Sequence, residues 1–309
     1  MTSELDEWAE EWDLVLRAGD LAEGTRVVYL RGVRQFIVWL HNCHAEAAEP
    51  RQVTDRHALK WAEHLKIDRQ LAKATRRLRL IALTLWFDYL VKQSDSGVPS
   101  NPFDEVELPQ PDQVPPDILP DNELAALLAT CKGGDFVDRR DEAVLRLLLD
   151  TGVRRAELVG IDLDNLDLAH QEATVTGKGG KTRIAPFGTK TTLALRKYLR
   201  ARGRRQHATD PSLFQSVRVH ATGEVRLTAA GVNAMIDRRC KQAGLGHRRP
   251  HQIRHTWAHD MLDNGAQESD VERLGGWAPG SKMVKWYGSA QADTRARKRA
   301  RSLSRGDRV

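Results

Sequence analysis

Apolar residues in the first hundred positions recur with the period of an α-helix. The clearest stripe has apolar side chains three or four positions apart: Val27, Leu30, Val33, Phe36, Ile37 and Leu40. This spacing is typical of a helix with one buried face, and Thr25 stands where an N-cap is expected. Two further helices are predicted over residues 53–65, with Thr54 as N-cap, and over residues 74–92. The first part of the chain is therefore expected to be helical.

A turn-rich segment interrupts this pattern. Residues 94–102 read SDSGVPSNP, and further prolines follow at positions 109, 111, 115, 116 and 120. Proline fixes φ and lacks a backbone N–H, so this composition prevents regular structure. A chain of 309 residues also exceeds what a single hydrophobic core usually supports. We predict a helical domain over residues 1–108, a linker over residues 109–120 and a second domain over residues 121–309.

The second part of the chain mixes two periodicities. Helical patterns recur over residues 121–128, 139–150, 191–202, 229–244 and 251–262. Asp121 is the expected N-cap of the first of these. The β-prone runs 173–176 and 183–187 flank a glycine-rich stretch, as in a β-hairpin. The expected fold class is mainly α: a helical N-terminal domain, then an α+β domain with a small antiparallel sheet.

The net charge and the distribution of basic residues indicate what kind of partner the protein binds. The net charge is +6, and basic residues cluster over residues 73–79, 202–205 and 295–301. Such clusters favour a polyanionic partner, because each neutralised phosphate releases counterions. No stretch approaches the ~20 apolar residues of a membrane span, and the acidic start of the chain lacks the apolar core of a signal peptide. We expect a cytoplasmic protein that does not bind membranes.

The positions of the cysteines and histidines do not predict disulfide bonds or a metal site. Cys43, Cys131 and Cys240 are scattered and odd in number, which implies no disulfide framework. His41, Cys43 and His44 lie close together, but no second pair of ligands stands at metal-site spacing. We therefore predict no metal site.

One motif resembles a nucleotide-binding loop. Residues 177–182 read GKGGKT, the ending of a phosphate-binding P-loop. That loop requires a glycine at position 175, where this chain has Val, and a helix afterwards, where this chain has a predicted strand. Nucleotide binding is not predicted, and no cofactor is expected.

Three separated segments carry residues suited to phosphate chemistry. The first, residues 150–158, reads DTGVRRAEL and places Arg154 at the start of an expected helix. The second is the lysine-bearing hairpin turn. The third, residues 251–255, reads HQIRH, with His251 and Arg254 three apart on one helix face. Trp277 and Tyr287 follow. Each residue type is common alone, but the order and spacing together indicate one active site.

In this arrangement the chain resembles the tyrosine recombinases, also called the integrase family, over nearly its whole length. The family's Thr-Gly-x-Arg-x-x-Glu-Leu stretch is matched by residues 151–158, its Gly-Lys-Gly turn by residues 177–179 and its His-x-x-Arg-His motif by residues 251–255. The resemblance implies a core-binding domain that contacts DNA, followed by the catalytic domain. It implies these catalytic residues: Arg154, Lys178, His251, Arg254, Trp277 and Tyr287.

The chain departs from the family pattern at two points. Members commonly read Leu-Gly-His before the tyrosine, whereas residues 274–277 read Leu-Gly-Gly-Trp. Trp is an accepted alternative, since its indole N–H can donate one hydrogen bond. The interval from Trp277 to Tyr287 is one residue longer than usual, and Pro279-Gly280 is the expected place of the extra residue.

The cleavage of a phosphodiester accounts for these residue types. Arg154 and Arg254 can bind the non-bridging oxygens and stabilise the charge that builds in the transition state. Tyr287, with an ordinary pKa of about 10, needs those arginines or a base to become a nucleophile. His251 can donate to the phosphate or accept the phenol proton. The product is a 3′-phosphotyrosine link, which requires neither ATP nor a metal.

The resemblance assigns the remaining roles. Lys178 would protonate the leaving 5′ oxygen, with Lys181 in the same turn as the competing candidate. Glu157 would orient an arginine or pack its helix, and His255 would support the reacting groups. The implied partner is double-stranded DNA with a specific recombination site, bound by a homotetramer that passes through a Holliday junction.

Two other functions stay open at this point: a type IB topoisomerase-like activity, and a catalytically inactive, architectural DNA-binding protein. Among recombinases, the length fits an Xer-like dimer resolvase or an enzyme that integrates and excises a mobile element. The Gly-Gly-Trp variant and the basic C-terminal tail slightly favour the mobile element.

Overall fold

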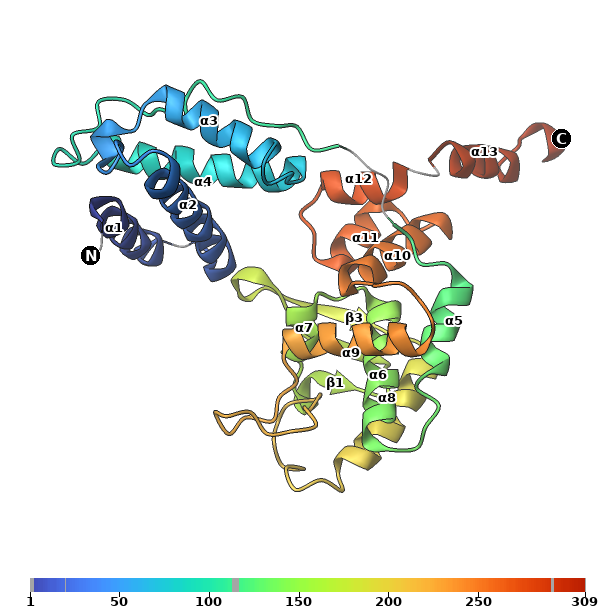
Figure 1. The fold of residues 1–309 in the computed structure, drawn as a ribbon. Helices are drawn as coiled ribbons and strands as arrows, with labels where there is room; N and C mark the ends of the chain where they lie inside the picture. Colours follow the sequence, from blue (N-terminus) through green and yellow to red (C-terminus); the bar gives the residue numbers. More distant parts are fainter. Residues whose placement is uncertain (1–2, 20, 113–116, 290–291, 309) are drawn as a thin grey trace. The chain divides into compact units, whose positions relative to one another are not determined.

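The chain folds into two compact units, Met1–Val114 and Pro115–Val309, in a computed structural model (Figure 1). The structure describes residues 3–19, 21–112, 117–289 and 292–308, with the backbone alone at positions 178, 289, 292–295, 298 and 308. Each unit has a hydrophobic core of its own. None of the described helices is long and apolar enough to cross a membrane.

The first unit is helical, as predicted. Its described elements are α1 (Glu4–Ala18), α2 (Glu23–Cys43), a 3-10 turn (Pro50–Gln52), α3 (Asp55–Lys66) and α4 (Lys73–Val91). The apolar stripe of α2 is buried from Leu30 onward, whereas Val27 is exposed. The ring of Phe36 on α2 lies within 6.4 Å of three rings outside that helix, which belong to Trp61, Phe87 and Phe103. One side chain of α2 therefore joins α3, α4 and the segment after α4.

The predicted start of α2 is wrong. The helix begins at Glu23, so Thr25 lies inside it and is not the N-cap. Arg26, near the start of this helix, pairs through its guanidinium with the carboxylate of Asp13 on α1. This ion pair is a tertiary contact, which local sequence does not report. For α3, by contrast, Thr54 is the N-cap, as predicted.

The described residues between α4 and position 121 form no helix or strand, in agreement with their proline content. Their first part packs on the first unit. Asn101 Nδ2 donates to the carbonyl of Thr84 (3.0 Å) and to a carboxylate oxygen of Asp88 (2.7 Å). Phe103 and Val106 are buried in the same core. This stretch is therefore part of the helical unit.

The second unit combines helices with one small sheet, which confirms the predicted fold class. Its elements are α5 (Asp121–Ala129), α6 (Phe136–Thr151), α7 (Arg155–Val159), β1 (Leu166–Asp167), β2 (Glu172–Thr176), β3 (Thr182–Pro186), α8 (Thr189–Arg202), α9 (Ala229–Gln242), α10 (Pro250–Asp263), α11 (Glu268–Gly275), α12 (Lys282–Ser289) and α13 (Ala292–Ser302), with 3-10 turns at Leu163–Asn165, Lys178–Gly180 and Gly306–Arg308. The N-cap prediction for Asp121 is wrong. Pro120, which already has extended backbone angles, takes the cap position.

The sheet has the order β1-β2-β3 and is antiparallel throughout. Val175 is opposite Arg183, and Thr176 is opposite Thr182, so the predicted hairpin is confirmed. Its turn contains Gly179 and Gly180 with φ of 75° and 73°, values that favour glycine. Because side chains alternate along a strand, Arg183 shares a face with the buried Ala185.

The end of α6 approaches α10 at a glycine. Gly152 caps α6 with a left-handed φ of 57°. A Cβ at this position would lie 2.2 Å from the ring of Trp257 on α10. Glycine is therefore needed for its backbone conformation and also for its size. Arg154, two residues later, reaches its position through this turn.

Gly152→Ala is expected to lower the free energy of unfolding by about 2 kcal/mol or more, because strain at positive φ adds to overlap with a buried ring. Gly179→Ala is the matched control. Its φ is also positive, but nothing lies within 4 Å of the added methyl, so about 1 kcal/mol of backbone strain is expected. Urea unfolding of the full-length chain, followed by circular dichroism, measures both. Equal losses would contradict the close approach to Trp257.

Candidate active site

The second unit brings most of the predicted site residues together. Arg154 lies at the N-cap of α7; His251 and Arg254 lie on α10; Tyr287 lies on α12, and Trp277 precedes it. Lys178 lies in the hairpin turn, and only its backbone is described. Its neighbour Gly177 borders the site, since a Cβ there would be 3.3 Å from Glu157.

The site is organised around the end of α11. Here three arginines donate to three successive carbonyl oxygens. Arg183 Nε donates to Leu274 (2.8 Å), Arg254 Nη2 to Gly275 (2.7 Å) and Arg154 Nη2 to Gly276 (3.2 Å). The last carbonyls of a helix lack partners within the helix and carry partial negative charge. The end of α11 is therefore suited to hold three cations side by side.

The two glycines at this turn explain the unusual Leu-Gly-Gly-Trp sequence. Gly276 is the C-cap of α11 with a left-handed φ of 67°, and a Cβ there would meet the Arg183 guanidinium at 3.0 Å. At Gly275 a Cβ would lie 2.0 Å from the Trp277 ring. Larger side chains at either place would push the arginines or the tryptophan away.

Glu157 joins two of these arginines. Its Oε1 accepts from Arg154 Nη1 (2.8 Å) and Arg183 Nη1 (3.0 Å), and its Oε2 accepts from the Arg154 backbone N–H (2.7 Å) and Arg183 Nη2 (2.8 Å). Burial alone would raise the pKa of this carboxyl, but the hydrogen bonds from Arg183 and Arg154 outweigh it and lower the pKa. The carboxylate therefore stays ionised and fixes the orientation of Arg154, one of the two roles expected for it.

Arg183 is a site residue that sequence reasoning missed. It binds Glu157 with two nitrogens and Leu274 with the third, so it connects β3, α7 and α11. One signal was present in the sequence. A charged residue on the core-facing side of a strand needs a buried partner, and Arg183 alternates with Ala185 on that side.

Arg254 is held in a dry, aromatic environment. Only 2% of it is exposed, and its Nη1 donates to the carbonyl of Gly152 (2.5 Å). Its guanidinium carbon lies 3.8 Å from the centre of the Trp277 ring, a cation–π contact. Burial, with repulsion from Arg154, lowers its pKa to about 9. The side chain is therefore still cationic at neutral pH.

Trp277 contacts both the arginine and the tyrosine in spite of the longer interval between positions 277 and 287. Its ring lies 5.5 Å from that of Tyr287 and stacks at 6.2 Å on Trp257 of α10. The lengthened loop includes Gly280 with φ of 75°. In this structure Trp277 therefore provides an aromatic surface under Arg254 and beside Tyr287.

Tyr287 is buried, with 1% of its surface exposed. The rings of His255, Trp286 and Trp277 surround it at 4.8, 5.3 and 5.5 Å. Burial raises the pKa of its phenol, an effect that the charges of Arg254 and Arg154 partly oppose. The phenol is therefore protonated at neutral pH and has to lose its proton in order to act as a nucleophile.

Two histidines lie next to this group. The rings of His251 and His255 are 4.8 Å apart. Loss of water lowers the pKa of His251, and the charge of Arg254 adds to the effect. Burial, with the charge of His251, lowers the pKa of His255 to about 4. Both rings are therefore neutral at pH 7, the form that can accept a proton.

Glu157→Gln is expected to cost about 3 kcal/mol of folding free energy, because it leaves two half-buried guanidiniums without their counter-charge. Glu142→Gln removes a single ion pair with Arg146 on α6, where the carboxylate is 22% exposed instead of 3%, and is expected to cost less than about 1 kcal/mol. Urea unfolding at pH 7 compares the two losses.

Urea unfolding of the wild type and Glu157→Gln at lower pH tests the same network. Since the folded pKa of Glu157 is lowered, its contribution to the free energy of unfolding exists above the unfolded pKa of 4.5 and is lost as pH falls below that value. A loss at Glu157 no larger than at Glu142, or one independent of pH, would contradict this network.

Comparison with known proteins follows the same two units. Residues 117–293 match the model of the phage integrase family, and residues 8–95 match the model of the phage integrase N-terminal SAM-like domain. A tyrosine recombinase XerC from Azotobacter vinelandii is 33% identical over 255 residues, which cover 81% of each chain. A tyrosine recombinase XerC from Corynebacterium glutamicum is 39% identical over 163 residues, 49% of this chain and about half (51%) of that protein.

Solved structures show the same fold. The integrase of transposon Tn1549, in complex with transposon right end DNA, superimposes with a TM-score of 0.71 at 20% identity and covers 98% of this chain and 99% of that one. A lambda integrase tetramer bound to a Holliday junction gives a TM-score of 0.70 at 16% identity, with coverage of 92% and 76%. The sequence match to the catalytic family model spans more than half of the chain. The chain thus belongs to the phage integrase family, the family of the tyrosine recombinases.

Proposed function

We propose that this protein is a site-specific recombinase that cuts and rejoins DNA strands through Tyr287. The observation that carries the proposal is the convergence of Arg154, Arg254 and Tyr287, which come from three separate segments, at the end of α11. Arg154 is 40% exposed at its side chain and so can reach a ligand. Arg254 uses two of its five N–H groups on carbonyls. A phosphodiester would supply the negative charge that is needed to balance these cations.

The cleavage step follows from these groups. Arg154 and Arg254 bind the non-bridging oxygens, and the Tyr287 hydroxyl attacks phosphorus. The bond from phosphorus to the tyrosine oxygen forms as the bond to the 5′ oxygen breaks, and the pentacoordinate charge is stabilised by the two guanidiniums. His251 accepts the phenol proton, and Lys178 protonates the 5′ oxygen. The 3′-phosphotyrosine retains the energy of the broken bond, so a 5′ hydroxyl of another strand can reverse the step.

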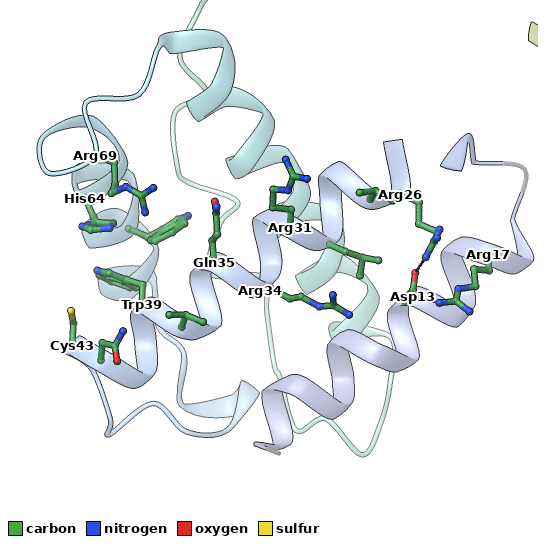
Figure 2. A pocket seen from close by; sticks show the side chains of 15 residues that line it. Asp13, Arg17, Arg26, Arg31, Arg34, Gln35, Trp39, Cys43, His64 and Arg69 are labelled. Atoms are coloured by element: carbon green, nitrogen blue, oxygen red, sulfur yellow. Dashed lines mark hydrogen bonds and ion pairs between the residues drawn. The ribbon is translucent and has the colours of Figure 1, made fainter. Parts of the chain in front are cut away.

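Residues 1–108, which lie within the first unit, are proposed to form a DNA-binding domain. A groove along α2 is lined by Arg31 and Arg34, with His64 and Arg69 from α3 and the segment after it (Figure 2). Guanidiniums of this kind suit the phosphate backbone. The basic cluster of residues 73–79, which lies on α4, is less available, because Arg79 Nη1 donates to the carbonyl of Val28 (3.2 Å). Residues 109–120 would connect this domain to the catalytic domain, residues 121–309.

The assembly and its biological setting complete the proposal. We propose a homotetramer on a Holliday junction in the cytoplasm, since each strand exchange needs paired cleavages on two duplexes. No observation favours a topoisomerase. An inactive architectural protein is not favoured either, because the described polar positions of the site are occupied by residues suited to catalysis. The recombination site decides between dimer resolution and integration or excision of a mobile element.

Tyr287→Phe is expected to abolish the covalent protein–DNA complex on a suicide substrate, in which a nick near the cleavage point lets the 5′ end escape. Substrates are drawn from the DNA that the protein protects around its own gene. The control is Tyr198→Phe, since Tyr198 donates to the carbonyl of Leu213, away from the site. A covalent complex formed by Tyr287→Phe, or none formed by the wild type on DNA that it binds, would contradict the proposal.

The pH profile tests His251 as the proton acceptor. Because the pKa of His251 is lowered from its ordinary 6.5, cleavage is expected to stay level as pH drops to about 6.5 and to fall at lower pH, where the ring is protonated and cannot act as a base. His251→Gln, which does not titrate, is expected to react about 100-fold more slowly and to lack this fall. Single-turnover rates between pH 5 and 8 measure both. An identical acid limb in the variant would assign the titration to another group.

A further inference from the structure

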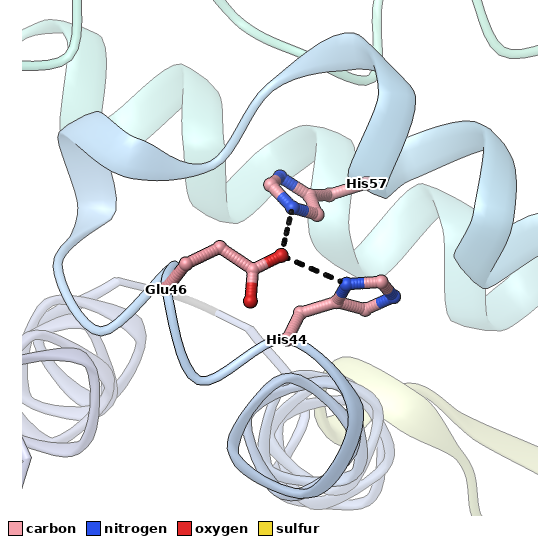
Figure 3. Close-up of side chains that lie close together, drawn as sticks. All are labelled: His44, Glu46 and His57. Carbon is pink, nitrogen blue, oxygen red and sulfur yellow. Dashed lines mark hydrogen bonds and ion pairs between the residues drawn. The ribbon is translucent and has the colours of Figure 1, made fainter.

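Two histidines and a glutamate converge where α2 ends and α3 begins (Figure 3). Glu46 Oε1 lies 3.1 Å from His44 Nδ1 and 3.6 Å from His57 Nε2. The ligating atoms of all three side chains lie within 4.8 Å of one another. Within the described part of the chain, no other group of His, Cys, Asp or Glu is this compact. It belongs to the first unit, outside the candidate active site.

The backbone fixes where these side chains stand. His44 is the C-cap of α2, and its ring lies 4.8 Å from that of Trp39. His57 is the third residue of α3 and contacts its N-cap, Thr54. Each imidazole is only 12% exposed, whereas Glu46, in the connection between the helices, is 68% exposed. Two oriented imidazoles thus face one carboxylate that is free to adjust.

We propose that His44, Glu46 and His57 bind a divalent transition metal ion, with zinc as the best fit. Two imidazoles and a carboxylate are a common ligand set for zinc. A tetrahedral zinc ion with ligands at about 2.0–2.1 Å places ligand atoms about 3.3 Å apart. The distances from Glu46 Oε1 to the nitrogens of His44 and His57, 3.1 and 3.6 Å, lie on either side of that value. The two histidine nitrogens are within 4.8 Å of each other, and a rotation of the rings would bring them closer. The fourth position is open to water.

One hydrogen bond of His57 has to change when a metal ion binds. The backbone N–H of Thr54 donates to His57 Nδ1 (3.1 Å), which places the proton of a neutral ring on Nε2, facing Glu46. A metal ion at Nε2 requires the proton to be on Nδ1 instead, so the bond from the Thr54 N–H would be replaced by one from Nδ1–H to Thr54 Oγ1, which also lies at 3.1 Å. Ligating histidines commonly hold such an oxygen acceptor behind them.

This group shares only His44 with the His41, Cys43 and His44 cluster noted in the sequence, for which no metal site was predicted. His41 and Cys43 are exposed residues of α2 and lie outside the compact group. The group forms because the loop after His44 returns to the start of α3. A bound ion would therefore link the end of α2 to the start of α3 and stabilise the connection. This role is independent of DNA cleavage.

Metal-stripped, full-length protein is titrated with Zn²⁺ in competition with a chromophoric chelator. One equivalent is expected to bind, and both His57→Ala and Glu46→Gln are expected to weaken binding by at least ~10-fold. His41→Ala, a nearby exposed histidine outside the group, is the matched control and is expected to leave binding unchanged. Co²⁺ supplies a second readout, because a four-coordinate site gives intense visible absorption bands, which the two ligand variants should lose.

Folding and binding are separated by Glu46→Gln. Because Glu46 is exposed, this variant is expected to keep the helical circular dichroism of the wild type while it loses the metal. Zn²⁺ should raise the thermal midpoint of the wild type and leave that of Glu46→Gln unchanged. Absence of saturable binding in the wild type, or equal affinity in wild type, His57→Ala and Glu46→Gln, would overturn the proposal.

Discussion

The carbonyl oxygens of Leu274, Gly275 and Gly276 each accept a hydrogen bond from a different arginine, and the candidate active site depends on that turn. Like charges repel, so three guanidiniums come together only where the protein supplies compensating negative potential. The C-terminal carbonyls of α11 supply one part, and the Glu157 carboxylate supplies another. Glycine at positions 275 and 276 lets the backbone come close enough. Changes to this turn would therefore alter the positions of Arg154, Arg183 and Arg254 together.

The same electrostatics support the proposed binding of a phosphodiester. Glu157 is the carboxylate that binds Arg154 and Arg183, whereas Arg254 donates to carbonyls, so positive charge remains in excess; burial, followed by repulsion from Arg154, lowers the pKa of Arg254. A phosphodiester relieves it. Tyr287 is the opposite case, since burial raises its pKa and the nearby arginines favour its ionised form. The arrangement proposed to bind phosphate would therefore also favour ionisation of Tyr287, the proposed nucleophile.

Sequence patterns predicted the parts of this site that have local signals. Arg154 follows a helix break, His251 and Arg254 share a helix face, and the glycine-rich turn indicated the hairpin. Features set by tertiary contact were missed. Arg183 became visible as a site residue only once β3 was packed against α7 and α11. The pairing of Arg26 with Asp13 of α1 and the His44–Glu46–His57 group bring residues together through tertiary contacts, which local patterns do not show. The side chain of Lys178 lies outside the described residues, so its role remains a proposal.

The most direct test of the account is to identify the amino acid that becomes linked to DNA. A covalent complex trapped on a nicked substrate can be digested with nuclease and protease and sequenced by mass spectrometry. The account predicts a nucleotide remnant, attached through its 3′ phosphate, on the peptide that contains Tyr287 and on none that contains Tyr29, Tyr89 or Tyr198. A remnant on one of those tyrosines, or on a residue of another type, would contradict it.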